Sequence, residues 1–401
     1  MNCSRRVFLT TASVAAIGTR MAGASIQGAN DRVRVAIIGT GGRARGLMNQ
    51  LKPIAGVEIV GVCDVFEQRL LQAAEIAGPA AFKTPEYRRV LDNKEIDAVL
   101  IGAPDHWHKK MTLDAVAAGK DVYVEKPVSH TIEEGAEMVR VIEASKQVVQ
   151  TGTQQRSWPH YLQGKELIQS GKLGQITFVQ SYWYQHARPG NWPAEQPAGL
   201  DWKQWLGPAK DQPFRPERLY QWRHFWDFGG GQSTDLMTHW IDVVHWYMNV
   251  EAPLSVYSSG KNYNMKMWEA PDTVSTTIEF PNNFTCAHLG TYVSRVDDGG
   301  LEFRGELGTL KIDRARLAFY KDDTPYAKGT LTPPPEILIE STGDGSIAHL
   351  QNWIDCVRSR QKPNAHIRVA HQAARTSHLA NASLKAGKVV RWNSAQERID
   401  S

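Results

Sequence analysis

The sequence predicts an α/β protein in which a doubly wound parallel sheet is followed by an α+β domain with a mostly antiparallel, open sheet. Three observations support this prediction. The chain of 401 residues is long enough for two cores, strand and helix signals alternate in its first part, and alternating strands dominate its later part. We expect a leader and linker over residues 1–30, a first domain over 31–152 and a second over 153–401, whose C-terminal helices can pack back on the first.

The first domain is predicted from short β-branched runs separated by helical segments. The run 33–38 ends at Gly39, as a buried strand does when it enters a turn. Further strands are expected at 59–63, 98–101 and 121–124, and helices at 68–76 and 110–118. This alternation predicts parallel strands with helices on both faces of the sheet.

The composition changes after residue 152. Residues 158–228 are rich in Trp, Pro and Gly and are predicted to be irregular, and a helix is expected at 233–248. Strands with one covered face are expected at 274–280, 286–293, 301–304 and 309–312, followed by helices at 347–358 and 368–386 that Pro363 separates.

A glycine-rich turn directly after the first strand predicts a dinucleotide site. The turn reads G-x-G-x-x-A and opens a helix; its residues are Gly39, Thr40, Gly41, Gly42, Arg43 and Ala44. Such glycines let the backbone approach a pyrophosphate, whose charge sits at the helix N-terminus. Asp64 ends the second strand 20 residues after Ala44, where a carboxylate accepts a hydrogen bond from the ribose 2′-hydroxyl. An acid there repels a 2′-phosphate, so NAD is expected rather than NADP, although Arg69 leaves NADP open.

The first 24 residues have the composition of an export signal. Arg5 and Arg6 precede Val-Phe-Leu and a short apolar run, and a small-residue cleavage site, A-G-A, stands at 22–24. The arginine pair resembles the twin-arginine consensus, which predicts recognition by the twin-arginine translocation machinery, a periplasmic or otherwise exported protein, and no stable membrane insertion after cleavage. The formal charge of +4 includes Arg5, Arg6 and Arg20, so the remainder carries 4 − 3 = +1. A near-neutral chain without a basic stripe argues against nucleic acid as a partner.

Three further motifs are typical of one enzyme family. A-P-D-H-W-H at 103–108 follows one predicted strand, and E-K-P at 125–127 ends the next. Later, G-G-G at 229–231 is followed by D-x-x-x-H-x-x-D at 235–242. With these motifs in this order, the chain resembles the Gfo/Idh/MocA family of oxidoreductases from residue 33 nearly to its C-terminus.

The resemblance implies a Rossmann domain that holds a nicotinamide cofactor, with Lys126 and His239 beside the reacting carbon of the substrate. Cofactor contacts are also expected from Ala103, Pro104, His106, His108, Glu125, Lys126 and Gln154. The open sheet of the second domain commonly forms dimers or tetramers in this family, so a homo-oligomer is expected. No ligand set completes the H-x-H pair at 106–108, and no metal is expected.

The chemistry of alcohol oxidation assigns roles to the same residues. A base must remove the hydroxyl proton, and a cation must stabilise the developing alkoxide. Lys126, at the C-terminal end of a parallel strand, can supply the cation. Asp235, His239 and Asp242 are spaced i, i+4, i+7, which predicts one helix face with the imidazole as base between carboxylates. We expect Lys126, His239 and Asp235 to be catalytic, while Asp242 fits an orienting or a capping role. The predicted contacts to a carbohydrate substrate are Lys126, Arg156, Tyr184, His186, Arg223, Asp235 and His239.

Export would limit the supply of cofactor, because NAD is scarce outside the cytoplasm. We therefore expect NAD to be loaded before export and held tightly. The favoured function is hydride transfer between this cofactor and a secondary alcohol of a sugar, glycoside or cyclitol. Two alternatives stay open: an NAD-dependent glycosidase that acts by transient oxidation at C3 and elimination, and a non-catalytic sugar-binding protein with a vestigial Rossmann domain.

Overall fold

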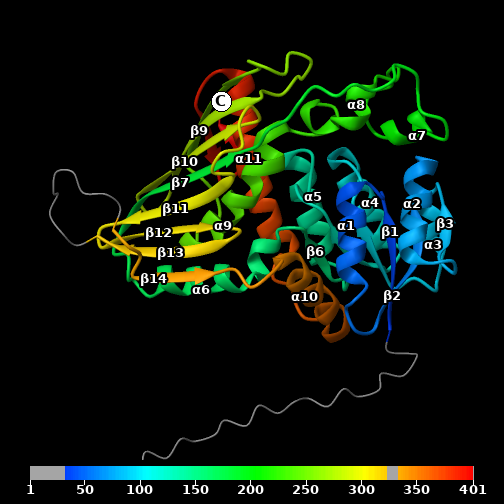
Figure 1. Cartoon of the computed structure of the whole chain (residues 1–401), viewed down its shortest axis with the longest axis horizontal. Helices are drawn as coiled ribbons and strands as arrows, with labels where there is room; N and C mark the ends of the chain where they lie inside the picture. Colours follow the sequence, from blue (N-terminus) through cyan, green and yellow to red (C-terminus); the bar gives the residue numbers. More distant parts are fainter. Residues whose placement is uncertain (1–31, 323–332, 401) are drawn as a thin grey trace, which may run out of the picture. The chain divides into compact units, whose positions relative to one another are not determined.

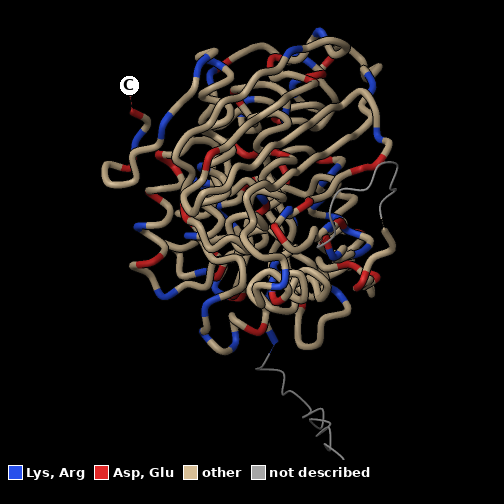
Figure 2. The backbone as a smooth tube through the Cα atoms, turned by 90° about the vertical axis from the view of Figure 1, so that its left-hand side faces the viewer, with Lys and Arg blue, Asp and Glu red and all other residues tan. Residues whose placement is uncertain are grey.

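The computed structural model describes residues 32–322 and 333–400, and the predicted leader lies outside this range. From Val33 onward the chain forms one compact unit that contains two sheets (Figure 1). Acidic and basic residues are interspersed along the backbone in Figure 2, in keeping with the near-neutral charge of the sequence beyond residue 24. No helix in the described part is long and apolar enough to cross a membrane.

The first sheet has six parallel strands in the order β3-β2-β1-β4-β5-β6, which confirms the predicted doubly wound sheet. Its strands are β1 Val33–Ile38, β2 Val57–Cys63, β3 Phe82–Thr84, β4 Ala98–Ile101, β5 Asp121–Val124 and β6 Val149–Thr151. The helices between them are α1 Gly42–Leu51, α2 Glu67–Ala77, α3 Tyr87–Asp92, α4 Asp105–Ala117 and α5 Ile132–Glu143. The chain passes from β3 at one edge to β4 beside β1, so a switch point lies between β1 and β4, where sheets of this kind bind ligands.

Helices cover both faces of the first sheet (Figure 1). One face packs against α1, α2 and α10 (Gly345–Ser359), with Leu47 and Trp353 in its core. The other packs against α3, α4, α5 and the start of α11 (Ile367–Ala386), which contributes Ala374. Because the strands are buried on both sides, they form continuous apolar runs in the sequence. The two C-terminal helices are thus part of the core of the first sheet.

Helix α4 begins at Asp105, whereas the sequence analysis predicted a helix from residue 110. Pro104 occupies the N-cap position, where its missing N–H leaves no helical hydrogen bond unmade. Asp105 lies in the first turn, where the helix dipole favours a negative charge. The A-P-D-H-W-H motif is therefore mostly helical and not a loop.

The second sheet has ten strands in the order β14-β13-β12-β11-β7-β10-β9-β8-β15-β16. Its strands are β7 Ile176–Tyr184, β8 Ser255–Lys261, β9 Thr273–Phe280, β10 Phe284–Thr291, β11 Gly299–Gly305, β12 Gly308–Asp313, β13 Arg316–Lys321, β14 Ile337–Glu340, β15 Val390–Asn393 and β16 Arg398–Asp400. Neighbouring strands are antiparallel except β7 and β10, which run parallel. Alternate residues of β9 are buried, so one face is covered and the other is open, as predicted.

Residues 158–228 contain regular structure that the sequence analysis missed. Helix α6 (Pro159–Gln169) and strand β7 lie in this stretch, and the short helices α7 (Trp202–Leu206) and α8 (Pro216–Tyr220) follow. Trp183 and Trp205 are buried in the core of the second domain. The aromatic residues of this stretch therefore reflect packing, which composition alone did not distinguish from irregular structure.

The predicted helix 233–248 consists of two segments. Ser233–Met237 forms a π-helical turn, and α9 (Thr238–Met248) continues from it. A π-helix has more residues per turn than an α-helix, so the spacing i, i+4, i+7 no longer places Asp235 on the face that an α-helix predicts. Single π-turns of this kind are frequent at functional sites.

Histidines are built into both cores in their neutral form. Burial lowers the pKa to about 3 for His106, His224, His245, His288 and His371, and to about 4 for His349, His366 and His378. His245 illustrates the arrangement: Nδ1 lies 2.7 Å from Val250 O, and Nε2 lies 2.9 Å from Thr376 Oγ1. One ring nitrogen donates and the other accepts, as a neutral imidazole requires.

These histidines make the free energy of unfolding depend on pH. An unfolded histidine binds a proton below about pH 6.5, whereas the folded chain resists protonation down to pH 3–4. The unfolded state therefore binds more protons below pH 6.5, and each such histidine costs roughly 1.4 kcal/mol of stability per further pH unit. We predict that guanidinium unfolding gives a free energy lower by about 3 kcal/mol or more at pH 5.5 than at pH 7.5. Equal values at pH 7.5 and 8.5 are the control, and equal values at 5.5 and 7.5 would contradict the prediction.

Candidate active site

Two loops meet at the switch point of the first sheet, and two glycines make their close approach possible. Gly39 follows β1 with φ of +77°, and a Cβ there would lie 2.6 Å from Ala103 N. Gly102 follows β4, and its Cβ would lie 2.8 Å from the Cβ of Ala44. Only glycine fits at Gly39, because both the backbone angle and the space exclude a side chain.

Gly41 and Gly42 are glycines for a different reason. No protein atom lies within 4 Å of a Cβ placed at either residue. Gly41 is the N-cap of α1, which has no side-chain cap and no acidic residue in its first turn. The free amide groups of this helix start face open space, which is the arrangement that binds a pyrophosphate.

This open space belongs to a first cavity of about 290 Å³. Its lining includes Gly39, Gly41, Gly42, Arg43, Asp64, Arg69, Ala103 and Pro104 from the first domain and Trp205, Leu219, Tyr220 and Trp222 from the second. Two predicted cofactor residues, Ala44 and Thr40, do not line this cavity but support the residues that do. Ala44 supports Gly102, and Thr40 donates to Asp64 Oδ2 from its amide at 2.7 Å and from its hydroxyl at 3.0 Å.

Asp64 therefore has two tasks. It fixes the glycine-rich turn through Thr40, and its Oδ1 accepts from Phe66 N at 2.9 Å. A carboxylate oxygen can accept two hydrogen bonds, so Oδ1 keeps a lone pair for a ribose hydroxyl in the cavity that Asp64 lines. The uncapped helix start, the open glycines and this carboxylate together fit an NAD molecule.

A second cavity of about 240 Å³ adjoins the first. The two share Arg43, Gly102, Ala103, Trp222 and Arg223. The second is further lined by His108, Glu125, Lys126, Gln154, Trp183, Leu236, His239 and Arg314. Residues from both domains thus line a space that shares one wall with the dinucleotide cavity.

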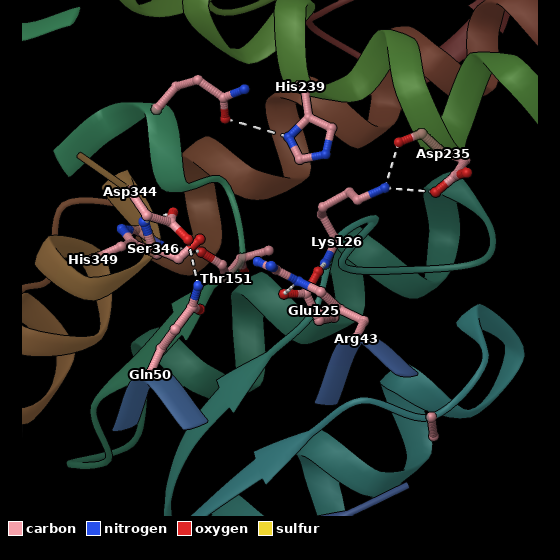
Figure 3. A network of polar contacts seen from close by, with 12 residues as sticks. Arg43, Gln50, Glu125, Lys126, Thr151, Asp235, His239, Asp344, Ser346 and His349 are labelled. Atoms are coloured by element: carbon pink, nitrogen blue, oxygen red, sulfur yellow. Dashed lines mark hydrogen bonds and ion pairs between the residues drawn. The ribbon is translucent and has the colours of Figure 1, made fainter. Parts of the chain in front are cut away.

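Lys126 and Asp235 form an ion pair across the two domains (Figure 3). Lys126 follows β5, and its Nζ donates to Asp235 Oδ1 at 2.6 Å and to the backbone oxygen of the same residue. Both side chains are largely buried, with 10% and 16% of their surfaces exposed. An ammonium group has three N–H donors, so one remains for a ligand in the second cavity.

Asp235 also accepts from Arg223 Nε at 3.2 Å. Burial acts to raise the pKa of Asp235, but Lys126 and Arg223 hold it below the usual value for a carboxyl group. Asp235 is therefore a fixed anion between two cations. Asp105 lies within their field, and burial raises its pKa well above the usual value.

His239 lines the same cavity from α9. Its Nδ1 lies 3.3 Å from Gln155 Oε1, and an amide oxygen only accepts, so Nδ1 carries the proton and Nε2 is a free acceptor. Figure 3 places that second nitrogen on the side of the ring toward Lys126. Burial, followed by the charge of Lys126, lowers the pKa of His239 well below 6.5. His239 is thus neutral at ordinary pH and able to take up a proton.

The carboxylates do not flank His239 as the sequence analysis expected. Asp242 instead pairs with Arg156, whose Nε lies 2.9 and 2.8 Å from its two oxygens, and both residues are buried. This pair fastens the 3-10 turn Gln154–Ser157 to α9. Arg156, predicted as a substrate contact, therefore acts on the site only by positioning Gln154 and Gln155.

Three other predicted site residues lie elsewhere. Tyr184 ends β7 and lines a depression with residues of β8, β9 and β10, outside both joined cavities. His186 is exposed. His106 is packed against Trp205 and Phe228 and lines neither cavity. Tertiary packing, and not chain proximity to the motifs, decides these positions.

The remaining predicted residues come together. His108 bridges two loops, with Nδ1 2.6 Å from Pro127 O and Nε2 2.9 Å from Ala103 O. Glu125 accepts from Arg43 Nε at 3.0 Å, and Gln154 presents a buried Oε1 that has no partner among the described residues. No group of three or more His, Cys, Asp and Glu side chains in the described ranges is arranged to hold a metal ion.

Sequence reasoning missed Gln155, Trp183 and Arg314. Gln155 sets the tautomer of His239, and Trp183 stacks on the His239 ring with centroids 5.5 Å apart. Arg314 lies 4.6 Å from the Trp183 ring centroid. No motif marks these residues. Gln155 directly follows a predicted contact, but Trp183 and Arg314 reach the cavity only because β7 and the β12–β13 turn lie beside it.

A glycine-rich turn at the switch point, joined to a cavity with a fixed cation and a neutral imidazole, defines an NAD-binding oxidoreductase. Residues 33–153 match the model of the oxidoreductase family with an NAD-binding Rossmann fold, and residues 161–311 match the GFO/IDH/MocA C-terminal domain. The chain belongs to the Gfo/Idh/MocA family of oxidoreductases.

Individual relatives match parts of the chain. An inositol 2-dehydrogenase of Saccharopolyspora erythraea is 34% identical over 35% of this chain and 42% of that protein. A glycosyl hydrolase family 109 protein of Solibacter usitatus is 32% identical over 36% of this chain and 37% of that protein. The structure of a levoglucosan dehydrogenase with NADH and levoglucosan has a TM-score of 0.71 at 18% identity, covering 90% of this chain and 99% of that one. This last likeness is one of fold.

Gly41 allows a sharp test of the cofactor site. A Gly41→Ala change adds a methyl group where the protein leaves open space and keeps a backbone angle that alanine adopts readily. We predict NAD binding about tenfold weaker or more, a loss of about 1.4 kcal/mol, with an unchanged melting temperature of the NAD-free protein. Calorimetric titration with NAD measures the first and differential scanning the second. Gly46→Ala, on the exposed side of α1, is the matched control, and equal affinity in both variants would exclude the proposed approach of the pyrophosphate.

Proposed function

We propose that this protein is an NAD-dependent dehydrogenase of a secondary alcohol in a sugar, glycoside or cyclitol. The observation that carries the proposal is the pairing, at one cavity, of a buried ammonium group with a spare donor and a neutral imidazole with a free acceptor. NAD held by the glycine-rich turn and Asp64 would accept the hydride from the carbinol carbon. The residues of the chain handle the proton and the charge on oxygen.

Lys126 acts on the substrate oxygen. Two of its three N–H donors are taken by Asp235, and the third is free to donate to a hydroxyl oxygen in the second cavity. As the hydroxyl loses its proton, negative charge grows on this oxygen, and a fixed cation lowers the energy of that state. Asp235 holds the ammonium group in place, and Arg223 in turn holds Asp235. The cation therefore needs little reorganisation as charge develops on the substrate oxygen.

His239 acts on the hydroxyl proton. Its Nε2 takes the proton while the carbinol C–H electron pair leaves and the C=O double bond forms. Gln155 holds the opposite ring nitrogen as the N–H, which keeps Nε2 free. In the reverse direction, protonated His239 returns the proton to the new hydroxyl group. The lowered pKa of His239 keeps Nε2 unprotonated through the neutral pH range, as a proton acceptor must be.

Relatives support the substrate class. One similar protein is named as an inositol 2-dehydrogenase, and one similar structure holds levoglucosan together with NADH. Inositol and levoglucosan are both ring compounds that carry secondary hydroxyl groups. A cavity of about 240 Å³ with Lys126 and His239 on its wall is a reasonable size for one such ring.

Substitution of the two polar groups tests the proposal. We predict that Lys126→Met and His239→Asn each lower kcat by roughly 10²–10⁴-fold, because each removes one component of proton transfer or charge stabilisation. NAD affinity should change little. NADH absorbance across a panel of hexoses and inositols gives the rates, and titration gives the affinity. His186→Asn is the control, since this exposed histidine lines neither cavity; full activity in the Lys126 variant would refute the role given to the ammonium group.

A redox-neutral glycosidase is the second candidate, because one relative is a glycosyl hydrolase family 109 protein. In that reaction the C3 hydroxyl is oxidised, the C2 proton becomes acidic and is removed, and the aglycone leaves by elimination. Water then adds to C1 of the unsaturated ketone, C2 regains a proton, and the hydride returns to C3. The same Lys126 and His239 would serve the oxidation. Release of nitrophenol from nitrophenyl glycosides without accumulation of NADH would favour the glycosidase, whereas accumulation of ketosugar and NADH in equal amounts favours the dehydrogenase.

We also propose that NAD stays bound between turnovers. The segment around α7 and α8 lies over the first cavity, and it is held to the β2–α2 turn by backbone hydrogen bonds from Glu67 N to Gly199 O at 2.9 Å and from Asp201 N to Val65 O at 3.0 Å. Trp205 and Tyr220 from this segment line the cavity. We expect this cover to slow the departure of a cofactor that is bound beneath it.

Retention of NAD has a direct measurement. We predict close to one NAD(H) per chain in the supernatant of denatured protein that was purified without added nucleotide, as measured by absorbance and mass spectrometry. The Trp205→Ala variant should retain less, because the segment then covers the cavity less completely. A wild-type protein free of nucleotide would refute retention and leave the dehydrogenase proposal intact.

A further inference from the structure

Arg314 is held rigidly at the turn between β12 and β13. The Oδ1 atom of Asp313 accepts from Ala315 N at 2.7 Å and from Arg316 N at 2.8 Å, which fixes the turn. The backbone oxygen of Asp313 accepts from His160 Nε2 at 2.8 Å, which ties the turn to α6. Arg314 therefore enters the second cavity from a fixed backbone position.

The guanidinium group of Arg314 has no anionic or hydrogen-bonding partner among the described residues. Its Nε is buried and donates to no acceptor. The guanidinium group lies over the face of Trp183, 4.6 Å from the ring centroid, and Trp183 stacks in turn on His239. An aromatic face attracts a cation but offers no acceptor for its N–H groups.

The other cations of the cavity are each paired with a carboxylate. Arg43 pairs with Glu125 at 3.0 Å. Lys126 and Arg223 share Asp235. Among the residues that the structure describes, Arg314 is thus the cavity cation without an ion pair, since Asp298 and Asp344 act on its charge without contacting it.

Even partial burial without a hydrogen-bonded partner is unfavourable for a guanidinium group, and Arg314 is partly buried. Burial lowers the pKa of Arg314, as expected for a charge taken out of water. A buried charge is normally paired and hydrogen-bonded. Arg314 has no ion-pair partner among the described residues, and an anion that enters the cavity would supply one.

We propose that the second cavity binds a carboxylated carbohydrate, with Arg314 as the residue that recognises the carboxylate. This inference rests on the proposed function and narrows its substrate class. The NAD pyrophosphate does not account for Arg314, since Arg314 lines the second cavity and not the first. A planar guanidinium matches the two oxygens and single negative charge of a carboxylate, whereas a phosphate dianion would leave a charge unmatched by one free cation.

A carboxylated sugar would contact the site at both of its ends. Arg314 holds the carboxylate, and Lys126 and His239 face the hydroxyl group to be oxidised. Trp183 lies between Arg314 and His239, so a sugar ring can rest against the same wall. Neutral sugars would still reach Lys126 and His239 but would leave the Arg314 charge unpaired.

Binding to the NADH-loaded protein tests the proposal without turnover, because an alcohol is not oxidised when the cofactor is already reduced. The probes are three pairs of hexose and hexuronate with gluco, galacto and manno configuration, together with each hexose 6-phosphate. Isothermal titration calorimetry measures the dissociation constants. For at least one configuration, the dissociation constant of the hexuronate should be at least tenfold lower than that of the hexose. This difference should decrease when salt is added.

Variants of Arg314 assign the preference to this residue. Arg314→Met should reduce the ratio of hexose to hexuronate dissociation constants to within threefold of one and leave hexose binding unchanged within about twofold. Arg314→Lys keeps the charge but not the planar fork and should retain part of the preference. Arg316→Met, at an exposed position of the same turn outside both cavities, is the matched control and should bind as the wild type does.

Three outcomes would overturn the inference: no pair with a preference for the acid, a preference that survives in a folded Arg314→Met protein or is undiminished in a folded Arg314→Lys protein, or tighter binding of a 6-phosphate than of the matching hexuronate. The test is independent of catalysis. NADH formation from neutral sugars without any acid preference would leave the dehydrogenase proposal standing. Acid preference without NADH formation from any sugar would leave the binding inference standing alone.

Discussion

The ion pair between Lys126 and Asp235 is the constraint on which the site depends. It joins the end of β5 in the first domain to the π-helical turn before α9 in the second. Neither domain alone contains both charges. Because the ammonium group is held by the side chain and the backbone oxygen of Asp235, its remaining donor has a defined direction into the second cavity. Any change that moves one domain against the other would disturb this direction first.

Buried polar pairs behind the site keep the second domain in place. Arg156 and Asp242 fasten the turn that carries Gln155 to the helix that carries His239. Gln232 accepts from His288 Nε2 at 3.0 Å and donates to Trp183 O at 3.1 Å, which links the start of the π-turn to β10 and β7. These groups do not reach the cavity. They fix the positions of the side chains that do, as a preorganised site requires.

The first domain could be predicted well because its signals are local. The β-branched runs, the glycine-rich turn and Asp64 lie in one continuous segment, and their order alone indicates a Rossmann sheet. The second domain was harder. Strand β7 and helix α6 were missed because their aromatic residues serve a core that is formed by distant strands. The helix at 233–248 was placed correctly along the chain, yet its π-turn was not foreseen, since no residue pattern distinguishes it from an α-helix.

The sequence by itself determined the sheet, the glycine-rich turn and the motif residues Lys126, Asp235 and His239, because each depends on short-range spacing and on the chemistry of single side chains. Only the tertiary structure decided the partners. It paired Asp242 with Arg156 and Lys126 with Asp235, and it left Tyr184 and His186 outside both cavities. It also brought Gln155 to His239, and Trp183 and Arg314 to the second cavity. The physical reason is that a charge or a hydrogen-bonding group acquires its role from what faces it across the fold. Arg314 lies 188 residues beyond Lys126 in the chain, and only the folding of the second sheet, in which β11 joins β12 and β13 to β7, places both on one cavity.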